Sequence, residues 1–406
     1  MYRVSPFIRH FALALLLGTV LATFWVNLSP DSYYDAIEWR MLDLPLPDWI
    51  AGSSSSLTLM GVTSDLLMAF FLFFLGKELW EANMLERGSL RGRRGAMPLM
   101  ATLGGMIGAV VVWVMLAAMF ETAEEASFGT GWAVPLGSDV VLGYLVGRMV
   151  FGAGSPALHV LLLLTIGTDI AGLLLLGFAY PDQPLRLIWL ALPLLASLGV
   201  WALFARHAHV GASEQHRQRA LHLWPYAIAG ALSWIGVAAS GLPPALGLLP
   251  VIPAIPHADR AFGLFAEAEE FLHDPLNRAA HLLVKPLIAI LFLFGLTRGG
   301  IDLLAFSPTT LVTLGAMWIG KPLGIILGGL ILAPMLGFPM PAGLRGRDIV
   351  IIAGIAGIGF TIPVLALDSA LPGGGMQEAA RLGLGISLLA GPIMVLASRK
   401  RGAAGR

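Results

Sequence analysis

The sequence predicts an all-α membrane protein with about twelve transmembrane helices, and composition and apolar patterning support this. Hydrophobic residues make up 57% of the chain and charged residues only 12%, far from the balance of a soluble domain. Several apolar runs reach the roughly 20 residues with which a helix crosses a bilayer. The formal net charge is zero, so no basic surface indicates nucleic acid as a partner. The chain has no cysteine, which excludes disulfides and thiolate metal sites.

The apolar runs follow one another along a single transmembrane domain, residues 1–406. The first run resembles a signal peptide, but it is too long and lacks a small-x-small cleavage site, so we expect a retained first helix. The seventh to ninth runs are the shortest, and prolines crowd the eighth. The expected spans are about 8–28, 57–76, 98–120, 132–150, 158–180, 186–204, 224–240, 242–256, 285–297, 309–333, 348–367 and 380–397.

Lysine and arginine concentrate in alternate connecting segments, most clearly in 77–94 and in the tail 399–406. The positive-inside rule then predicts that both termini lie in the cytoplasm. The apolar spans are expected to contact membrane lipid. Residues 29–56 form the one sizeable extracytoplasmic segment in this topology. A short hairpin and an interfacial aromatic anchor both fit its composition.

Four ionisable residues lie well within the expected spans, away from their ends: Asp65, Asp139, Asp169 and Lys321. A charge at the centre of a bilayer costs roughly 2.5–3.5 kcal/mol on insertion scales, so such residues usually mark ion or proton paths. The alternative is a buried ion-pair network that only ties helices together. For Asp65, a buried polar patch with the hydroxyls beside it is an equal alternative. Glu78 lies at the inner end of the second span, where a surface charge and a gating or pH-sensing residue both fit.

Two expected spans are interrupted by a break. Pro135 lies three residues before Ser138 in the fourth span, and Gly359 to Pro363 interrupt the eleventh around Thr361. Broken helices at corresponding places in two halves of a transporter indicate the binding site between its repeats. Backbone polar groups bared within a membrane need a cavity or protein around them. A carboxylate beside them suits a cation or a proton.

Enzyme motifs do not account for these residues. Lys321 ends a G-x-x-x-x-G-K pattern, but Pro322 replaces the Ser or Thr of a phosphate-binding loop, and no soluble strand precedes it. The chain contains neither H-E-x-x-H nor G-x-S-x-G, and its histidines show no metal-ligand spacing. We therefore expect neither an enzyme nor a cofactor.

Several stretches, spread nearly from end to end, resemble the NhaA family of sodium/proton antiporters. They are SDLLMAFFLFFLGKEL (64–79), GSLRGRRGAMPLMATLGGMIG (88–108), GWAVPLGSDV (131–140), SGLPPALG (240–247), IGKPLGI (319–325) and GIAGIGFTIP (354–363). The resemblance implies a fold of inverted repeats with two discontinuous helices. It also implies that the protein is located in a bacterial inner membrane. It also suggests a homodimer formed through residues 29–56.

The resemblance assigns the residues of an ion site. Ser138 and Asp139 would belong to the unwound fourth helix, Asp169 to the ion site on the fifth, and Lys321 to the buried lysine on the tenth. Thr361 would lie beside the break in the eleventh. Na⁺ or Li⁺ would bind transiently at Asp169 and Asp139, and protons would compete with it.

The chain departs from the family pattern at two points. The fifth helix of the family carries two consecutive aspartates, whereas this chain has Thr168 before Asp169. Lys321 has thereby lost the neighbour that would hold it charged. We expect it either to pair with Asp139 or Asp169 or to be neutral part of the time. The family's charged cluster at the inner end of the second helix is also reduced, with Glu78 followed by Leu-Trp-Glu-Ala.

The resulting hypothesis is a secondary transporter that exchanges a monovalent cation for protons by alternating access. Asp169 would bind a proton and a cation in turn, and Asp139 with Ser138 or Thr168 would shape the site. One alternative keeps the fold but uses it for symport of an anion or small acid. Another is a sensory or structural membrane protein that has lost transport.

Overall fold

The structure, a computed structural model, describes residues 7–43, 56–84, 95–120, 128–152, 154–181, 183–205, 220–256 and 275–403. Helices account for most of them. In the first half these are α1 (Phe7–Leu28), α2 (Pro30–Ile37), α3 (Leu59–Gly61), the π-helical turn η1 (Val62–Leu67), α4 (Met68–Met84), α5 (Ala96–Phe120), the 3₁₀ segment η3 (Phe128–Leu136), α6 (Val140–Phe151), α7 (Pro156–Ala179), η4 (Leu187–Leu190) and α8 (Ala191–Leu203).

The second half continues in the same way. It contains α10 (Trp224–Ser240), the 3₁₀ segments η6 (Pro244–Leu246) and η7 (Leu249–Ala254), α11 (Pro275–Arg298), α12 (Pro308–Gly315), the π-helical turn η8 (Ala316–Gly320), α13 (Lys321–Ile326), a second π-helical turn η9 (Leu327–Leu332), α14 (Ala333–Met335), α15 (Gly346–Ala356), α16 (Thr361–Ala370), α17 (Gly375–Ser387) and α18 (Ala390–Ala403).

The described helices confirm an all-α membrane protein. Seven continuous helical segments are long and apolar enough to cross a bilayer, and two bent pairs, η3 with α6 and α15 with α16, pass the same test. The three remaining expected spans correspond to η4–α8, α10 and η6–η7, which are shorter. In the eighth, Pro244, Pro250 and Pro253 remove backbone donors, so the chain forms short 3₁₀ turns instead of one helix. The ninth begins at Pro275, earlier than expected.

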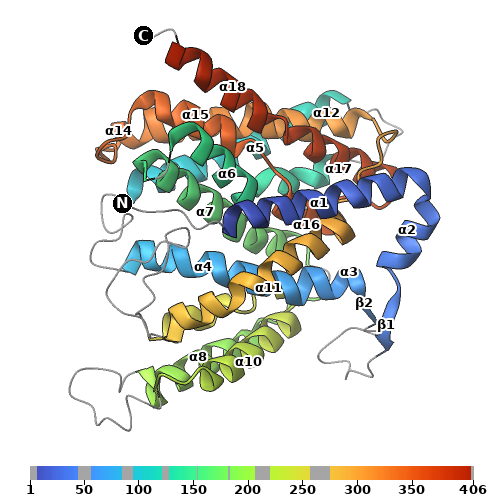
Figure 1. The fold of residues 1–406 in the computed structure, drawn as a ribbon, viewed down its shortest axis with the longest axis vertical. Helices are drawn as coiled ribbons and strands as arrows, with labels where there is room; N and C mark the ends of the chain where they lie inside the picture. The colour runs from blue at the N-terminus through green and yellow to red at the C-terminus, as the bar shows by residue number, and fades with distance from the viewer. Residues whose placement is uncertain are drawn as a thin grey trace.

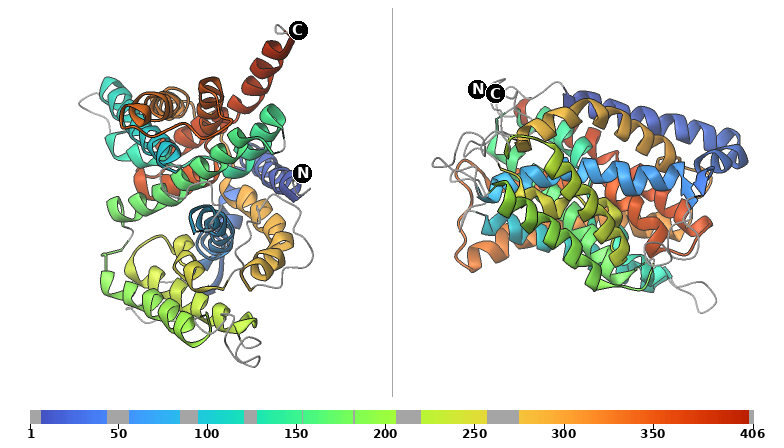
Figure 2. Two further views of the ribbon diagram at one scale, coloured as in Figure 1. Left: turned by 90° about the vertical axis from the view of Figure 1, so that its left-hand side faces the viewer. Right: turned by 90° about the horizontal axis from the view of Figure 1, so that it is seen from below.

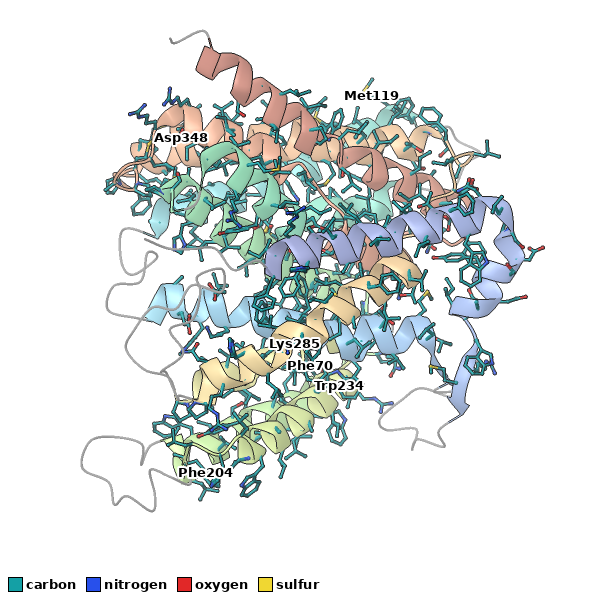
Figure 3. The ribbon with its side chains drawn as sticks, viewed as in Figure 1. Phe70, Met119, Phe204, Trp234, Lys285 and Asp348 are labelled. Atoms are coloured by element: carbon teal, nitrogen blue, oxygen red, sulfur yellow. The ribbon has the colours of Figure 1, made fainter. Side chains whose placement is uncertain are left out.

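The helices form two groups (Figures 1 and 2). The core group consists of α5, η3, α6, α7 and the segments from α12 to α18, which pack on one another. The panel group consists of α4, α8, α10, η6, η7 and α11, with α1 packed along α11. The two groups meet where α4 packs on α7 and α1 on α6. In the panel group, Phe70 and Trp234 (Figure 3) line an apolar cavity of about 450 Å³ between α4, α10, η7 and α11.

The closest helix contact of the core group joins α5 to α13. A Cβ atom built on Gly324 would lie 2.0 Å from the carbonyl oxygen of Gly104, so only glycine fits there. Small residues let transmembrane backbones approach in this way. The contact brings the side chain of Lys321, the first residue of α13, into the interior beside Gly105. The π-helical turn η8 comes directly before Lys321, and π turns are frequent at functional sites.

One end of the molecule, here called the hairpin end, carries α2 and a two-stranded antiparallel ribbon. Its strands are β1 (Arg40–Asp43) and β2 (Ser56–Thr58), and residues 44–55 lie outside the described part. The chain leaves α1 at this end, and α11 also finishes here (Figure 1). At the opposite end, α1 begins and α18 finishes (Figure 2). The first and last described helices of the chain therefore have these outer ends on one side.

Candidate functional site

The two broken helices cross each other in the core group. The chain bends by 51° at the break between η3 and α6, and by 51° at the break between α15 and α16. Residues 137–139 link the first pair, and residues 357–360 link the second. The N–H of Asp139 donates to the carbonyl of Ile358 at 2.9 Å, and the hydroxyl of Ser138 donates to the carbonyl of Ala356 at 3.3 Å. The crossing thereby satisfies part of the backbone that each break exposes.

The carboxylate of Asp139 joins the two pairs. As the N-cap of α6, its Oδ1 accepts a hydrogen bond from the N–H of Leu142 at 2.7 Å. Its Oδ2 accepts from the N–H of Thr361, the first residue of α16, at 3.2 Å. Asp139 is completely buried. A single negative charge therefore lies at the positive N-terminal ends of two short helices, which stabilises it.

Asp169 lies across the crossing from Asp139, on α7. Ser155 caps that helix and Pro156 occupies its first position, so α7 runs unbroken past the crossing. Oδ1 of Asp169 accepts a hydrogen bond from the N–H of Ser138 at 2.6 Å. Oδ2 is buried and has no hydrogen-bond partner among the described residues. A buried carboxylate oxygen without a partner is costly unless a proton or a cation joins it.

Lys321 approaches the same break from α13. Its ammonium donates to the carbonyl oxygen of Gly137 and to the hydroxyl oxygen of Ser138, the latter at 3.1 Å. Of the two states expected of Lys321, the direct pair with Asp139 or Asp169 is absent, because no ion pair within the described residues joins it to either carboxylate. Instead, the ammonium neutralises the negative C-terminal end of η3. The sequence could not indicate this partner, since every residue has a backbone carbonyl.

Thr168 completes this group. Its hydroxyl donates to the carbonyl of Thr165 at 2.8 Å, one turn back along α7, and lies 3.4 Å from the hydroxyl oxygen of Ser138. Thr168, Ser138 and Asp169 are all fully buried. Hydroxyl, carbonyl and carboxylate oxygens thus gather around the break in the fourth span, and hard cations prefer such oxygens as ligands.

The structure does not bring every predicted residue to this crossing. Pro135 lies inside η3, one residue before that segment ends, and so marks the break itself. Asp65 is exposed in η1, and its backbone carbonyl accepts a hydrogen bond from the indole of Trp234. Glu78 is buried in the C-terminal half of α4, 3.8 Å from the ammonium of Lys77. That ammonium pairs with Glu81 at 2.9 Å.

The whole chain has clear relatives. It matches the protein family described as Na⁺/H⁺ antiporter 1 over residues 9–397. The chain belongs to the NhaA family of Na⁺/H⁺ antiporters. A protein named Na(+)/H(+) antiporter NhaA from Jannaschia sp. (strain CCS1) is 41% identical, with 98% of each chain covered. Na(+)/H(+) antiporter NhaA 2 from Pelobacter propionicus is 34% identical, with 96% of this chain and 95% of that protein covered.

A sodium proton antiporter from Methanocaldococcus jannaschii, solved at pH 8, matches 98% of this chain and 97% of its own, with a TM-score of 0.48 and 15% identity. The NhaA family consists of transporters rather than enzymes, and its members are integral membrane proteins. The apolar helices of this chain fit that location.

In this NhaA-family chain, we expect Asp139→Asn to weaken cation binding more than turnover. The substitution removes the negative charge that offsets the positive N-termini of α6 and α16, an interaction of about 1–2 kcal/mol. The helix ends would then oppose a cation at the crossing, so the apparent KM for the cation should rise roughly fivefold to thirtyfold. Initial rates of exchange in proteoliposomes, measured over a range of cation concentrations, check this. An unchanged KM would restrict Asp139 to a structural role.

Proposed function

We propose that this protein exchanges Na⁺ or Li⁺ for protons, with Asp169 as the group that binds both in turn. One observation carries the proposal. Asp169 is fully buried where the two broken helices cross, with one oxygen held by Ser138 and the other without a hydrogen-bond partner among the residues that the structure describes. Family membership supports the same exchange, since the relatives are named Na(+)/H(+) antiporters.

The coupling follows from competition for one carboxylate. A proton on Asp169 removes the charge that would attract a cation, and a bound cation disfavours the proton, so the two ligands exclude each other. The hydroxyls of Ser138 and Thr168 lie beside this carboxylate and supply neutral oxygen ligands. Either ligand offsets the cost of a bare charge within the membrane, and so permits the loaded site to move.

Alternating access would use the two bent pairs. Asp139 ties the start of α6 to the start of α16, so both half-helices would move together when the site changes the side to which it opens. A ligand shifts such an equilibrium only by its different affinities for the two states.

The anion alternative is less well supported by the arrangement of Lys321. Its ammonium is already engaged by the carbonyl of Gly137 and the hydroxyl of Ser138, so it offers little unsatisfied charge to an anion. The unpartnered oxygen of Asp169 would repel one. A sensory protein without transport would not need that oxygen bare.

We also propose the orientation that the positive-inside rule predicts, in a bacterial inner membrane. Both termini then face the cytoplasm, and the hairpin end faces outward, because α1 begins and α18 finishes on the other side (Figure 2). A homodimer formed through residues 29–56 remains a prediction of the family resemblance.

Proton release from purified protein tests the proposed function. Adding Na⁺ or Li⁺ to weakly buffered protein in detergent should acidify the solution, because the cation displaces a proton from Asp169. A choline salt of the same anion should have no effect. A response to the anion instead would support symport, and no response to any ion would support a protein without transport. Either result would refute antiport.

A further inference from the structure

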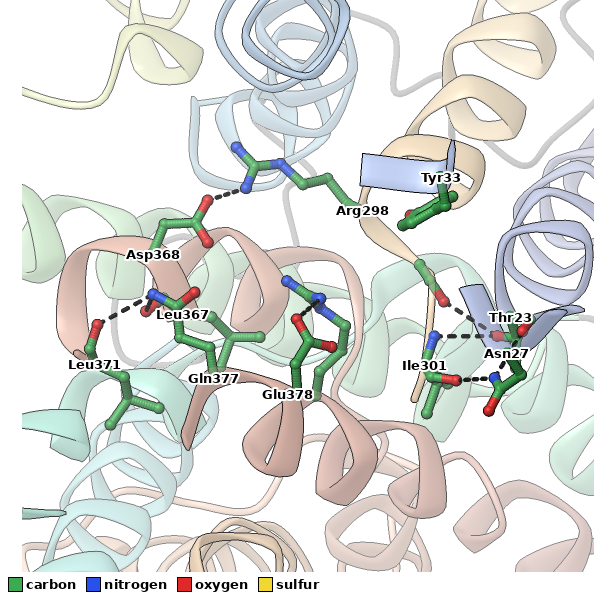
Figure 4. Close-up of polar contacts among 12 residues, drawn as sticks. Thr23, Asn27, Tyr33, Arg298, Ile301, Leu367, Asp368, Leu371, Gln377 and Glu378 are labelled. Carbon is green, nitrogen blue, oxygen red and sulfur yellow. Dashed lines mark hydrogen bonds and ion pairs between the residues drawn. The ribbon is translucent and has the colours of Figure 1, made fainter. Parts of the chain in front are cut away.

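At the hairpin end, one ion pair joins the panel group to the core group. Arg298, the last residue of α11, donates from Nη1 to Oδ2 of Asp368 on α16, as Figure 4 shows. α11 packs along α1 and α4, whereas α16 packs on η3, α7 and α17. The two charges therefore belong to different groups of helices and approach each other across the boundary between them.

Arg298 is fixed within the panel group. Its Nε donates to the hydroxyl oxygen of Ser64 in η1 at 2.7 Å, and only 9% of the residue is exposed. The segment after it is tied to α1, since the side chain of Asn27 donates to the carbonyl of Ile301 at 2.7 Å (Figure 4). The hydroxyl of Tyr33, from α2, donates to the carbonyl of Leu296 at 3.0 Å. The guanidinium thus has little freedom to follow a moving partner.

Asp368 is equally fixed within the core group. The amide of Gln377 on α17 donates to the carbonyls of Leu367 and Leu371, at 3.2 and 3.1 Å, and so secures the last turn of α16 (Figure 4). On α17 itself, Arg381 pairs directly with Glu378 at 2.6 Å and also attracts Asp368 at longer range. The direct ion pair of Asp368 is the one with Arg298 of the panel group.

The same short helix connects this pair to the candidate ion site. α16 begins at Thr361, whose N–H donates to the carboxylate of Asp139. Asp368 lies seven residues further along the helix, about 10 Å away at 1.5 Å per residue. A helix of this length moves as a unit, so a shift of the crossing at one end displaces the carboxylate at the other.

We propose that Arg298 and Asp368 form the gate at the hairpin end. While they are paired, the panel and core groups are held together on this side, and the pair must separate whenever the site opens here. The side chain of Asp368 is 37% exposed, whereas that of Arg298 is 9% exposed, so the pair lies at the edge of the protein and its carboxylate can be hydrated as the charges part. Hydration of the carboxylate lowers the cost of separating the pair, which suits a gate that opens in every cycle. The inference rests on the proposed exchange at Asp169.

Reversible cross-linking tests this gate, and the absence of native cysteine makes the chain suitable. In the variant Arg298→Cys/Asp368→Cys, a cleavable bifunctional thiol reagent would hold α11 to α16. We expect exchange in proteoliposomes to fall at least tenfold after treatment and to return on reduction. Proton release by Na⁺ in detergent should persist, because the site stays open to the other side. Unchanged exchange in cross-linked protein would overturn the gate.

A control pair lies at the same end but within the panel group. There the indole of Trp25 on α1 donates to the hydroxyl oxygen of Ser32 on α2 at 2.8 Å, and both residues are exposed. Cross-linking Trp25→Cys/Ser32→Cys should leave exchange unchanged, and an equal loss there would also overturn the proposal. If untreated wild-type protein showed neither exchange nor proton release, the proposed function itself would be refuted. Failure of the gate and failure of the proposed function are therefore distinguishable.

A second variant tests the gate without a reagent. Arg298→Gln/Asp368→Asn removes both charges together and leaves neither one buried without its partner. Weakening the closed state on this side should increase the population open to it, so the apparent cation affinity measured from the hairpin side should improve severalfold. Equal affinities in the variant and the wild type, from both sides of oriented proteoliposomes, would contradict the gate.

Discussion

Replacing Asp169 with asparagine should reduce cation/proton exchange to the background of protein-free liposomes. The amide is nearly the same size and can still accept the hydrogen bond from the N–H of Ser138, so the crossing of the broken helices should keep its shape. An amide nitrogen takes the place of Oδ2, so the side chain can neither bind the exchanged proton there nor supply a charge to hold a cation. Coupling is therefore lost while the fold remains. Exchange driven by a pH gradient, followed with a fluorescent dye, measures the effect.

A matched control distinguishes this loss from general damage. Asp302→Asn makes the same chemical change in the segment after α11, where the carboxylate only accepts a local hydrogen bond from Leu304 at 2.9 Å. Its exchange rate should stay close to that of the wild type. Both variants should elute as monodisperse protein with a thermal stability no lower than that of the wild type. Substantial exchange by Asp169→Asn would assign the coupling to another group, and Asp139 would be the next candidate.

The positions of the helices and of the breaks were predictable from sequence because both have local causes. An apolar run of about twenty residues specifies a spanning helix, and Pro135 specifies an interruption close to itself. The rarity of charges within such runs then identified Asp139, Asp169 and Lys321, which the structure gathers around one crossing. The prolines of the eighth span also indicated its weakness, although not that it would form 3₁₀ turns.

The partners of these residues were not predictable, because they depend on tertiary geometry. Asp139 binds a backbone N–H 222 residues away, and Lys321 binds a carbonyl 184 residues away. Backbone groups leave no mark in the sequence. Asp65 also lies within an apolar run but is exposed, so its position in the run did not indicate how far it is buried. The ion pair between Arg298 and Asp368 was missed because each lies at the end of its helix, where charges are common.

Exchange by the wild-type protein should be electroneutral, with one proton moved for each monovalent cation. α7 carries only Asp169 as a titrating carboxylate at the crossing, because residue 168 is threonine. Asp139 already accepts hydrogen bonds from two helix N-termini, so we expect it to keep its charge through the cycle. One carboxylate binds one proton or one cation, and the two half-cycles then move equal charge. The exchange rate should not respond to membrane potential.

Thr168→Asp should make the exchange electrogenic. The hydroxyl of Thr168 lies 3.4 Å from the hydroxyl of Ser138, which in turn lies 3.1 Å from the ammonium of Lys321. A carboxylate at this position would therefore come close enough to Lys321 to pair with it, and without such a partner its buried charge would not be tolerated. A second titrating group at the crossing would allow two protons for each cation, so net charge would cross the membrane.

Thr168→Asn, of similar size and without charge, serves as the control and should stay electroneutral. A potassium-diffusion potential clamped with valinomycin provides the measurement: exchange by Thr168→Asp should change with the potential by severalfold, and exchange by the wild type should not. A strong response of the wild type would contradict the one-carboxylate argument and would make Lys321, already bonded to the carbonyl of Gly137, the group that delivers the second proton.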